Sequence, residues 1–361
     1  MKSEKSYCFA ALVSFHPLFS SSLLGLEKPI THKNKIIENM KETPTIAVVM
    51  CTYNGERFLR EQMDSILAQT YPIAEIIVQD DGSTDNTVNI LRQYAERVPQ
   101  MQIHVNEKNL GFNRNFHTAC LRATADYIAI SDQDDVWMPN KLERQIEAIG
   151  PCNICYSTHL RGRDMATAHT VAPRCNLEAM LFTGIAGHTM IARRDFIQRP
   201  ESWTNDRIVY DWSLALNAYF FRQPNAIVRV DEPLNWHRSH DGEAALLQNI
   251  AVCGEQKRTT WQPYVYGLRN YRALQRKPNW HLVYNLIATH TAGNAALALP
   301  HRMASLMLRP GLWPLMQLCW LCMKHRNNLY PKAQSVRGVM GAVRGFFYPF
   351  IFSWHCSQFD M

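Results

Sequence analysis

The chain has 361 residues, of which 47% are hydrophobic, and a formal net charge of +7. This length and composition allow a full hydrophobic core, which excludes a disordered tail and fits one large domain with an extension, or two domains. Acidic residues outnumber basic ones between residues 45 and 250, whereas residues 251–361 carry thirteen Lys and Arg but only Glu255 and Asp360. We therefore expect an acidic body followed by a basic extension.

The N-terminal residues 1–43 are interpreted as an extension outside the main domain. Two lysines precede an uncharged stretch from residue 6 to 26, in the order of a signal peptide or membrane anchor. A His-Pro pair and three consecutive serines interrupt this stretch, so it is a poor membrane helix. A third interpretation, which we favour, is that Met40 is the natural start, because strand-like sequence begins directly afterwards at Thr45.

From residue 45 onward, short apolar runs alternate with segments of helical periodicity. The apolar runs predict strands over 46–51, 76–78, 102–105 and 127–130, and the periodic segments predict helices over 57–69, 85–97 and 112–123. This alternation is typical of a parallel sheet covered by helices. In such nucleotide-binding α/β domains, ligands collect beyond the carboxyl ends of the strands.

Three polar loops follow strands of this sheet, and we expect them at one edge. They are residues 51–55, 80–85 and 132–135. Each has a local explanation, since Asn54-Gly55 is a turn signal, Asp85 is placed to cap its helix, and Asp135 or Asn140 is placed to cap the next. Converging carboxylates nevertheless repel one another unless a cation or hydrogen-bond donors compensate. A Mg²⁺ or Mn²⁺ ion that shares its shell with a diphosphate would resolve the conflict.

Other classes of site are less well supported. The ten cysteines lack the spacing of a disulfide scaffold, so a reducing compartment is the simpler interpretation. Two CxxC pairs, Cys152 with Cys155 and Cys319 with Cys322, lie too far apart for a zinc ribbon, and we expect small buried apolar residues there. No acidic run has the spacing of a calcium loop, and the glycine motifs of ATPases and dinucleotide enzymes are missing.

Four motifs occur in a characteristic order and at characteristic separations. They are VMCTYNG, IIVQDDGSTD, NLGFNRNF and YIAISDQDDVWMPNKLE. Together they resemble the family 2 inverting glycosyltransferases with the GT-A fold, and most of all the rhamnosyltransferase-like enzymes of bacterial surface polysaccharides. The resemblance covers residues 44–243. It implies an α/β domain of the GT-A type, with a mainly parallel nucleotide-binding sheet flanked by helices.

The resemblance implies roles for the first two loops, at the positions that match the family's motifs. In such enzymes the loop after the first strand lies along the nucleotide, which here indicates Thr52, Tyr53 and Asn54. The second of the paired acids after the second strand binds the base. Asp81 is therefore expected to contact the base, with Asp80 nearby.

The acidic run implies the metal site. In the family, the first acid of the motif lies near the donor ribose or sugar, which indicates Asp132, and the next acid binds the metal, which indicates Asp134. The expected ion is Mn²⁺ or Mg²⁺. The role of Asp135 is left undecided, since capping of the next helix explains this residue equally well.

The catalytic base is expected much further along the chain. Asp211, in the segment IVYDWSL, resembles the acid at which these enzymes place their catalytic carboxylate, which removes the acceptor proton opposite the departing diphosphate. Partial desolvation beside Tyr210 and Trp212 would raise the pKa of this carboxyl group toward that of a useful base. The alternative is that Asp211 only begins the helix that runs to Phe220.

Two further segments resemble family motifs and contribute histidines. Residues 184–190 resemble the acceptor-side strand, which makes His188 a candidate contact, although a core-satisfied histidine is an equal alternative. Residues 235–240 resemble the basic motif that approaches the diphosphate or metal. Arg238 and His240 are therefore expected at that position.

Residues 244–361 are predicted to form a basic, aromatic-rich and mostly helical extension. Five of the nine tryptophans lie here, and cationic residues mixed with aromatic ones suit a membrane surface. The apolar stretches 310–323 and 345–359 are too short and too interrupted to span a bilayer. We expect either peripheral attachment to the cytoplasmic face of the plasma membrane or helices packed on the catalytic domain. Nucleic-acid binding lacks a recognisable module.

The predicted function is therefore metal-dependent, inverting transfer of a hexosyl or deoxyhexosyl group from a nucleotide-diphosphate donor to a glycan or lipid-linked acceptor. A sugar nucleotidyltransferase is one alternative, but CTYNGERF has only one glycine where a triphosphate loop needs several. A catalytically silent carbohydrate-binding relative is another, although Asp81, Asp134 and Asp211 are all present. The donor sugar, acceptor and linkage depend on loop side chains that the sequence does not arrange in space.

Overall fold

The computed structural model describes residues 43–204, 208–221, 226–240, 262–330 and 336–356. The described residues from Pro44 onward belong to one compact unit. The expectations about a leader, an anchor or a start at Met40 fall outside the described residues. So does the expected boundary between residues 243 and 244.

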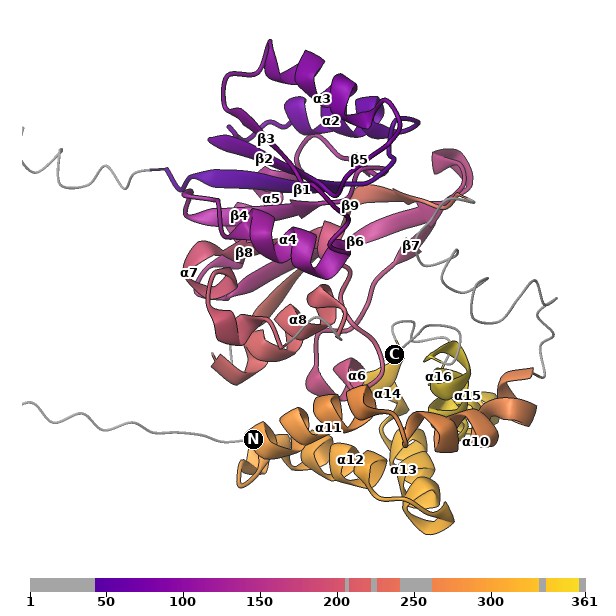
Figure 1. Ribbon diagram of the computed structural model, residues 1–361. Helices are drawn as coiled ribbons and strands as arrows, with labels where there is room; N and C mark the ends of the chain where they lie inside the picture. The colour runs from indigo at the N-terminus through magenta and orange to yellow at the C-terminus, as the bar shows by residue number, and fades with distance from the viewer. Residues whose placement is uncertain (1–42, 205–207, 222–225, 241–261, 331–335, 357–361) are drawn as a thin grey trace, which may run out of the picture. The chain divides into compact units, whose positions relative to one another are not determined.

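The first half of the sheet is parallel, as the sequence predicts (Figure 1). Its strands, in the spatial order β3-β2-β1-β4, are β1 (Ile46–Thr52), β2 (Glu75–Asp80), β3 (Met101–Val105) and β4 (Tyr127–Ser131). The helices between them are α2 (Leu59–Leu67), α3 (Thr87–Ala95) and α4 (Phe112–Cys120). Each helix is shorter than predicted, since loop turns take up residues at its ends. The strand order changes direction between β1 and β4, which is where ligands bind in open α/β sheets.

Beyond β4 the sheet contains further strands with antiparallel pairings, and the predicted mainly parallel sheet did not include these pairings. The added strands are β5 (Val136–Trp137), β6 (Ile154–Gly162), β7 (His169–Val171), β8 (Met190–Arg193) and β9 (Ile227–Arg238). β8 is antiparallel to β4 and β6, β9 is parallel to β6, and β5 is antiparallel to β9. The β5–β9 pairing sets Val136 opposite Trp236. It therefore brings the acidic run beside the histidine-rich end of β9.

The two faces of the sheet bury separate cores. In β1, Ile46, Val48 and Met50 join one hydrophobic cluster, and the alternating residues join the other. The first cluster contains buried residues of α2, α3 and α5 (Lys141–Ile149), and the second contains those of α4 and α8 (Tyr210–Phe221). Burying one such aliphatic side chain contributes roughly 1.5–3 kcal/mol, so both faces hold the strand in register.

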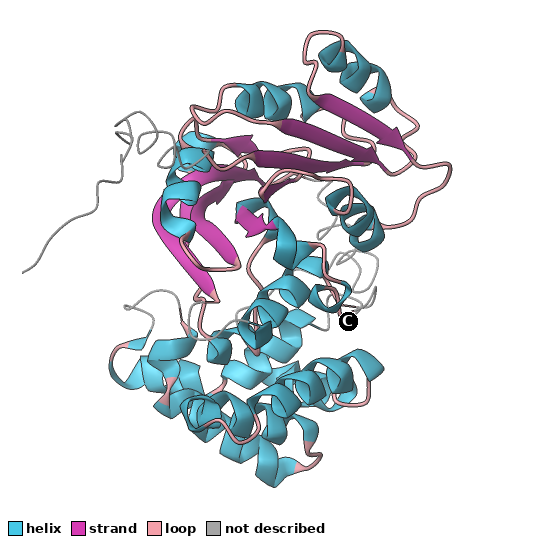
Figure 2. Cartoon of the chain, turned by 90° about the vertical axis from the view of Figure 1, so that its left-hand side faces the viewer, coloured by secondary structure: helices cyan, strands magenta, loops and turns pink. Residues whose placement is uncertain are grey.

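The C-terminal part is mostly helical, as predicted (Figure 2). Its longer helices are α10 (Gln262–Leu274), α11 (Pro278–Thr291), α12 (Ala298–Leu308), α13 (Leu312–Lys324), α15 (Gly338–Phe346) and α16 (Tyr348–Cys356). Helix α10 packs on α16, α11 on α12, and α13 on α15. The Tyr284 hydroxyl donates a 2.8 Å hydrogen bond to the Leu181 carbonyl, next to α6 (Leu177–Met180). Within the described ranges no helix has the length and apolar character needed to cross a membrane.

The cysteines of both CxxC pairs are buried thiols, as expected. Cys155 lies in β6, whereas Cys152 precedes that strand, and both belong to the same hydrophobic cluster. Cys319 and Cys322 lie in α13, within the other cluster. Burial raises the pKa of the Cys155, Cys319 and Cys322 thiols. All four cysteines lie in hydrophobic clusters, so they act as core residues.

Gly267 is expected to control how closely α10 approaches α16. A Cβ at this position would lie 2.4 Å from the Phe350 Cβ and 2.9 Å from its Cα. Gly267→Ala should therefore lower the free energy of unfolding by about 1–3 kcal/mol through overpacking, as measured by chemical denaturation. The control is Val265→Ala on the exposed face of the same helix. Equal stability of the two variants would contradict this close contact.

Candidate functional site

The loops after β1 and β4 meet at the change in strand order. The Gln133 side chain joins them, because its Oε1 accepts from the Tyr53 amide at 2.9 Å and its Nε2 donates to the Tyr53 carbonyl at 3.0 Å. Gly55 leaves room for this amide, since a Cβ there would lie 2.2 Å from the Gln133 Oε1. The first and third polar loops of the sequence therefore form one structure.

The Asp80 carboxylate holds the second loop in place. It is fully buried and accepts four hydrogen bonds, from the Thr52 hydroxyl, the amides of Gly82 and Ser83, and the Ser83 hydroxyl. These bonds use the carboxylate's usual accepting capacity. Asp80 and Thr52 thus shape the loop from within.

Asp81 is also engaged by the protein. Its carboxylate accepts from the amides of Leu110 and Gly111, at 2.7 and 2.9 Å, and from the Asn106 side chain at 2.7 Å. Gly111 has a φ of 83°, in the left-handed region that favours glycine. Asp81 thereby fixes the start of α4, and three of its acceptor positions are occupied in this structure.

Tyr53 and Asn54 differ in their environments. Tyr53 is 48% exposed, so its ring is available as a flat surface at the loop edge. Asn54 has a φ of 49°, and its Oδ1 accepts from the Thr84 amide at 2.9 Å. Its own amide donates to the Ser83 hydroxyl at 2.8 Å. Asn54 therefore joins the first loop to the second. Of the three expected nucleotide contacts, Tyr53 and Asn54 are exposed and Thr52 is buried.

The acidic run directs its carboxylates into different surroundings. Asp132 is partly buried, and its carboxylate makes no hydrogen bond to any residue that the structure describes. Burial, then the charges of Asp135 and Asp134, raise its pKa well above the ordinary value. The Asp134 carboxylate is 20% exposed and lies 2.8 Å from the Nε2 of His240. This pair joins the acidic run to the segment just after β9, since β9 ends at Arg238.

Arg238 lies between aromatic rings beside this pair. Its guanidinium is 4.7 Å from the centre of the Phe58 ring and 4.3 Å from that of Trp236. It also forms an ion pair with Glu61, and its Nε donates to the Asp134 carbonyl at 3.3 Å. Phe58 lies against His240 as well, with ring centres 4.7 Å apart. The sequence did not predict site roles for Phe58, Glu61 or Trp236. Phe58 and Glu61 lie outside the motifs given roles there, and in the motif of residues 235–240 only Arg238 and His240 were singled out.

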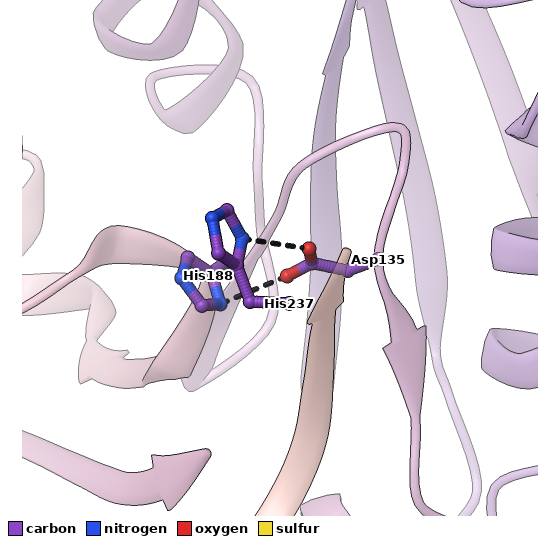
Figure 3. Close-up of side chains that lie close together, drawn as sticks. All are labelled: Asp135, His188 and His237. Carbon is purple, nitrogen blue, oxygen red and sulfur yellow. Dashed lines mark hydrogen bonds and ion pairs between the residues drawn. The ribbon is translucent and has the colours of Figure 1, made fainter. Parts of the chain in front are cut away.

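Asp135 does not cap a helix, so that interpretation is wrong. The helix α5 begins at Lys141, with Asn140 at its N-cap and no side-chain cap bond. The fully buried Asp135 carboxylate instead lies 2.8 Å from the Nδ1 of His188 and 3.0 Å from that of His237 (Figure 3). Burial would raise the pKa of Asp135, but the two imidazoles, His188 foremost, hold it well below its usual range.

The structure places His188 in the protein interior, with its Nδ1 toward Asp135. Burial lowers the pKa of His188, and the neighbouring Asp135 carboxylate acts against this shift. His188 belongs to η2 (Gly187–Thr189), within the segment of residues 184–190 expected on the acceptor side. These surroundings match the alternative interpretation of His188, which is a histidine satisfied within the protein core.

Asp211 lies in the first turn of α8 and is partly buried. Its carboxylate accepts from the Trp212 amide at 2.6 Å and from the Gly187 amide at 3.3 Å. Burial raises the pKa of Asp211 to about 6, although the backbone donors oppose the shift. Gly187 must lack a side chain here, because a Cβ would lie 2.1 Å from the Tyr210 hydroxyl.

The third sequence motif anchors the start of this helix. The Asn113 Oδ1 accepts from the Tyr210 amide at 2.9 Å, and its Nδ2 donates to the Ile208 carbonyl at 3.0 Å. A backbone amide and a carbonyl at the start of α8 are thereby satisfied. The motif NLGFNRNF therefore positions Asp211 from 98 residues away in sequence.

Asp134 and His240 could hold a divalent cation. Both side chains are partly exposed, and a carboxylate with an imidazole is a donor set that suits Mn²⁺ better than Mg²⁺, which prefers oxygen ligands. Asp132 and Arg238 lie in the same region, as a carboxylate and a cation, respectively. The arrangement therefore offers a carboxylate–imidazole pair beside a cation, and at Asp211 a carboxylate of raised pKa.

Comparison with known proteins gives several similarities. The sequence profile described as "Glycosyl transferase family 2" matches residues 47–197. The chain is 30% identical over 233 residues to the dTDP-rhamnosyl transferase RfbG of Shigella flexneri, covering 58% of this chain and 77% of RfbG. It is 39% identical over 108 residues to the putative glycosyltransferase EpsE of Bacillus subtilis strain 168, covering 30% of this chain and 39% of EpsE.

Other similarities are partial or concern the fold. The chain spans only 32% to 41% of the length of four curated relatives that it matches, EpsE among them. The solved mannosyltransferase PcManGT from Pyrobaculum calidifontis, in complex with GDP-Man and Mn²⁺, has a TM-score of 0.51 at 16% identity, covering 89% of this chain and 88% of that one. This likeness supports the GT-A fold predicted from the sequence. With 77% of RfbG matched, the chain belongs to glycosyl transferase family 2.

Proposed function

We propose that this protein transfers a sugar, with inversion, from a nucleoside-diphosphate donor to a hydroxyl group of a glycan or lipid-linked acceptor in bacterial surface-polysaccharide synthesis. The observation that carries the proposal is the placement of Asp211. Its carboxylate has a pKa raised to about 6 by burial, and its charge acts on Asp132 in the acidic loop. The Asp211 carboxylate is thus near enough to the loop expected to hold the donor for its charge to act there. The name of RfbG, a dTDP-rhamnosyl transferase, supports this class of donor.

The donor would lie along the edge formed by the β1 and β4 loops. The exposed Tyr53 ring offers a stacking surface for the base, and Asp132 offers an acceptor for sugar or ribose hydroxyls. Asp81 retains one accepting position beyond its three protein bonds. Thr52 and Asp80 act indirectly by shaping this edge.

Mn²⁺ or Mg²⁺ is proposed to bind Asp134 and His240 together with the donor diphosphate. When bound, such an ion neutralises charge on the leaving diphosphate. Arg238 adds a cation at the same place, held by Phe58 and Trp236 on its faces. Its fixed orientation means that little reorganisation is needed as negative charge develops.

Asp211 is proposed to accept the proton of the acceptor hydroxyl as its oxygen attacks the anomeric carbon. The new bond forms as the bond from that carbon to the diphosphate oxygen breaks, so the product has inverted configuration. The backbone amides of Gly187 and Trp212 hold the carboxylate in one orientation. Its raised pKa makes the group a stronger base than an exposed carboxylate.

The C-terminal helices are proposed to attach the protein to an anionic membrane surface. Leu312, Trp313 and Trp320 of α13 are 53%, 72% and 60% exposed, and Val339 and Met340 of α15 are 79% and 63% exposed. Since α13 packs on α15, these apolar side chains belong to adjoining helices. Exposed tryptophans on a basic region match the composition of membrane-surface helices.

Replacing the proposed base should separate binding from transfer. Asp211→Asn should reduce kcat by about 10²–10⁴-fold while leaving donor affinity nearly unchanged, because only proton removal is lost. In the unmodified protein, kcat/KM should be full above the pKa of about 6 and fall tenfold per pH unit below it, as the carboxylate becomes protonated. Undiminished turnover by the variant, or a flat profile down to pH 5, would refute this role.

Replacing the proposed metal ligand should remove metal-supported donor binding. Asp134→Asn should abolish the gain in nucleotide-sugar affinity that Mn²⁺ provides, measured by calorimetry with and without the ion. The control is Asp195→Asn, which changes an exposed carboxylate paired only with surface arginines among the described residues. The same Mn²⁺ dependence in both variants would exclude Asp134 as a ligand.

Membrane attachment should depend on the exposed tryptophans of α13. The double variant Trp313→Ala/Trp320→Ala should bind vesicles containing anionic lipids at least about tenfold more weakly in a flotation assay, because it loses large apolar surface. Val105→Ala/Leu121→Ala is the control, since these exposed apolar residues lie on the sheet domain. Equal flotation of both variants would count against attachment through α13.

A further inference from the structure

A second cluster of metal-ligand side chains lies beside the acidic run, among groups that the proposed transfer does not use. Asp135 precedes β5, His188 lies in η2 and His237 lies in β9. One ligand atom from each comes within 4.8 Å of the others. In Figure 3 both rings turn toward the two oxygens of the single carboxylate. Three distant segments thus converge on one buried point.

Asn235 completes this cluster from the fully buried part of β9. Its Nδ2 lies 2.7 Å from the His188 Nδ1 and 3.2 Å from the Asp135 Oδ2. Since the His188 Nδ1 is itself 2.8 Å from that same oxygen, the three atoms form a close triangle. Each side of the triangle is short enough for a hydrogen bond.

While Asp135 is ionised, no placement of the protons on these groups makes all three contacts favourable. If the His188 Nδ1 carries a proton, it donates to Asp135 but opposes the Asn235 amide hydrogens. If it carries none, it accepts from Asn235 but sets its lone pair against the carboxylate oxygen. One contact is therefore repulsive in either tautomer, in surroundings where buried polar groups are normally satisfied.

A cation would satisfy this triangle after one small change. The Asn235 Oδ1 is buried and has no hydrogen-bond partner among the described residues. A half-turn of the amide exchanges Oδ1 with Nδ2 and places that oxygen in the triangle. Two ligands about 2.1 Å from one ion lie about 3.0–3.4 Å apart, close to the spacing of these atoms. The ligands would then be Asp135, His188 and Asn235. His237 would join them once its ring moves closer, since the ligand atoms of the cluster lie up to 4.8 Å apart.

A second buried polar atom without a hydrogen-bond partner in the described part of the chain lies beside the cluster, in His159. His159 is 5% exposed, and its Nδ1 has no hydrogen-bond partner among the residues described. Its ring lies edge-on to both imidazoles of the cluster, with centres 5.1 Å from His188 and 6.1 Å from His237. Two unsatisfied buried polar atoms, in Asn235 and His159, therefore border the same cluster.

We propose that Asp135, Asn235, His188 and His237 bind a divalent transition-metal ion, Zn²⁺ foremost, as a structural site separate from the Asp134–His240 pair. Two imidazoles with a carboxylate and an amide oxygen form a mixed nitrogen and oxygen set that suits Zn²⁺ and disfavours Mg²⁺. The site shares no side chain with the proposed donor-metal site. It joins the acidic loop to η2 and to the end of β9, and it does not depend on sugar transfer.

Direct metal binding tests the site in the full-length protein. After treatment with a chelator and dialysis, the protein should take up one equivalent of Zn²⁺ without any nucleotide, measured by calorimetry and elemental analysis. Co²⁺ should bind in its place and give visible d–d bands without the near-ultraviolet charge-transfer band of a sulfur ligand. That spectrum separates the site from the buried cysteines. Uptake below a tenth of an equivalent, or a sulfur band, would overturn the proposal.

Variants locate the ion. His188→Gln/His237→Gln should lose the tightly bound equivalent and the increase in melting temperature that Zn²⁺ gives the unmodified protein. His240→Ala, which removes the partner of Asp134, and His281→Ala, an exposed histidine of α11, should keep both. Circular dichroism checks that each variant is folded. If the folded double variant keeps its equivalent of Zn²⁺, these residues are excluded as ligands. If the double variant does not fold, the Co²⁺ spectrum of the unmodified protein provides the test.

Discussion

The arrangement of the site depends on mutual repulsion among three carboxylates within four residues. Asp132, Asp134 and Asp135 cannot lie in similar surroundings without a large cost in electrostatic free energy. The structure separates them: Asp134 is paired with His240, Asp135 is buried between His188 and His237, and Asp132 stays partly buried with a raised pKa. Two of the three charges are thus matched by imidazoles.

The fold makes this separation possible through a strand of only two residues. β5 follows the acidic run directly and pairs antiparallel with β9, so that the histidines near the end of β9 face the run. The GT-A sheet has its change in strand order at the opposite side of the same loop, where Gln133 binds Tyr53. The acidic loop is therefore held on one side by the pairing of β5 with β9 and on the other by the side-chain amide of Gln133.

The sequence predicts the parts of this architecture that depend on local patterns. The first four strands, the three helices between them, the polar loops and Asp211 all follow from periodicity or from contiguous motifs. The cluster around Asp135 could not be predicted, since Asp135 and His237 are 102 residues apart and only tertiary pairing brings them together. Asp80 and Asp81 show the converse case. Their motif is evident, but the sequence does not reveal that backbone amides and hydroxyls occupy most of their oxygens.

Gly187 and His188 are neighbours in the chain but serve opposite sides of the site. The Gly187 amide binds Asp211, and the His188 ring binds Asp135. Consecutive Cα atoms are about 3.8 Å apart across a rigid trans peptide. A shift of the acidic loop by about an ångström would therefore change the orientation of the Asp211 carboxylate through a single peptide unit. The acidic loop and Asp211 are thus connected through the Asp135–His188 contact, one peptide unit and the hydrogen bond from Gly187 to Asp211.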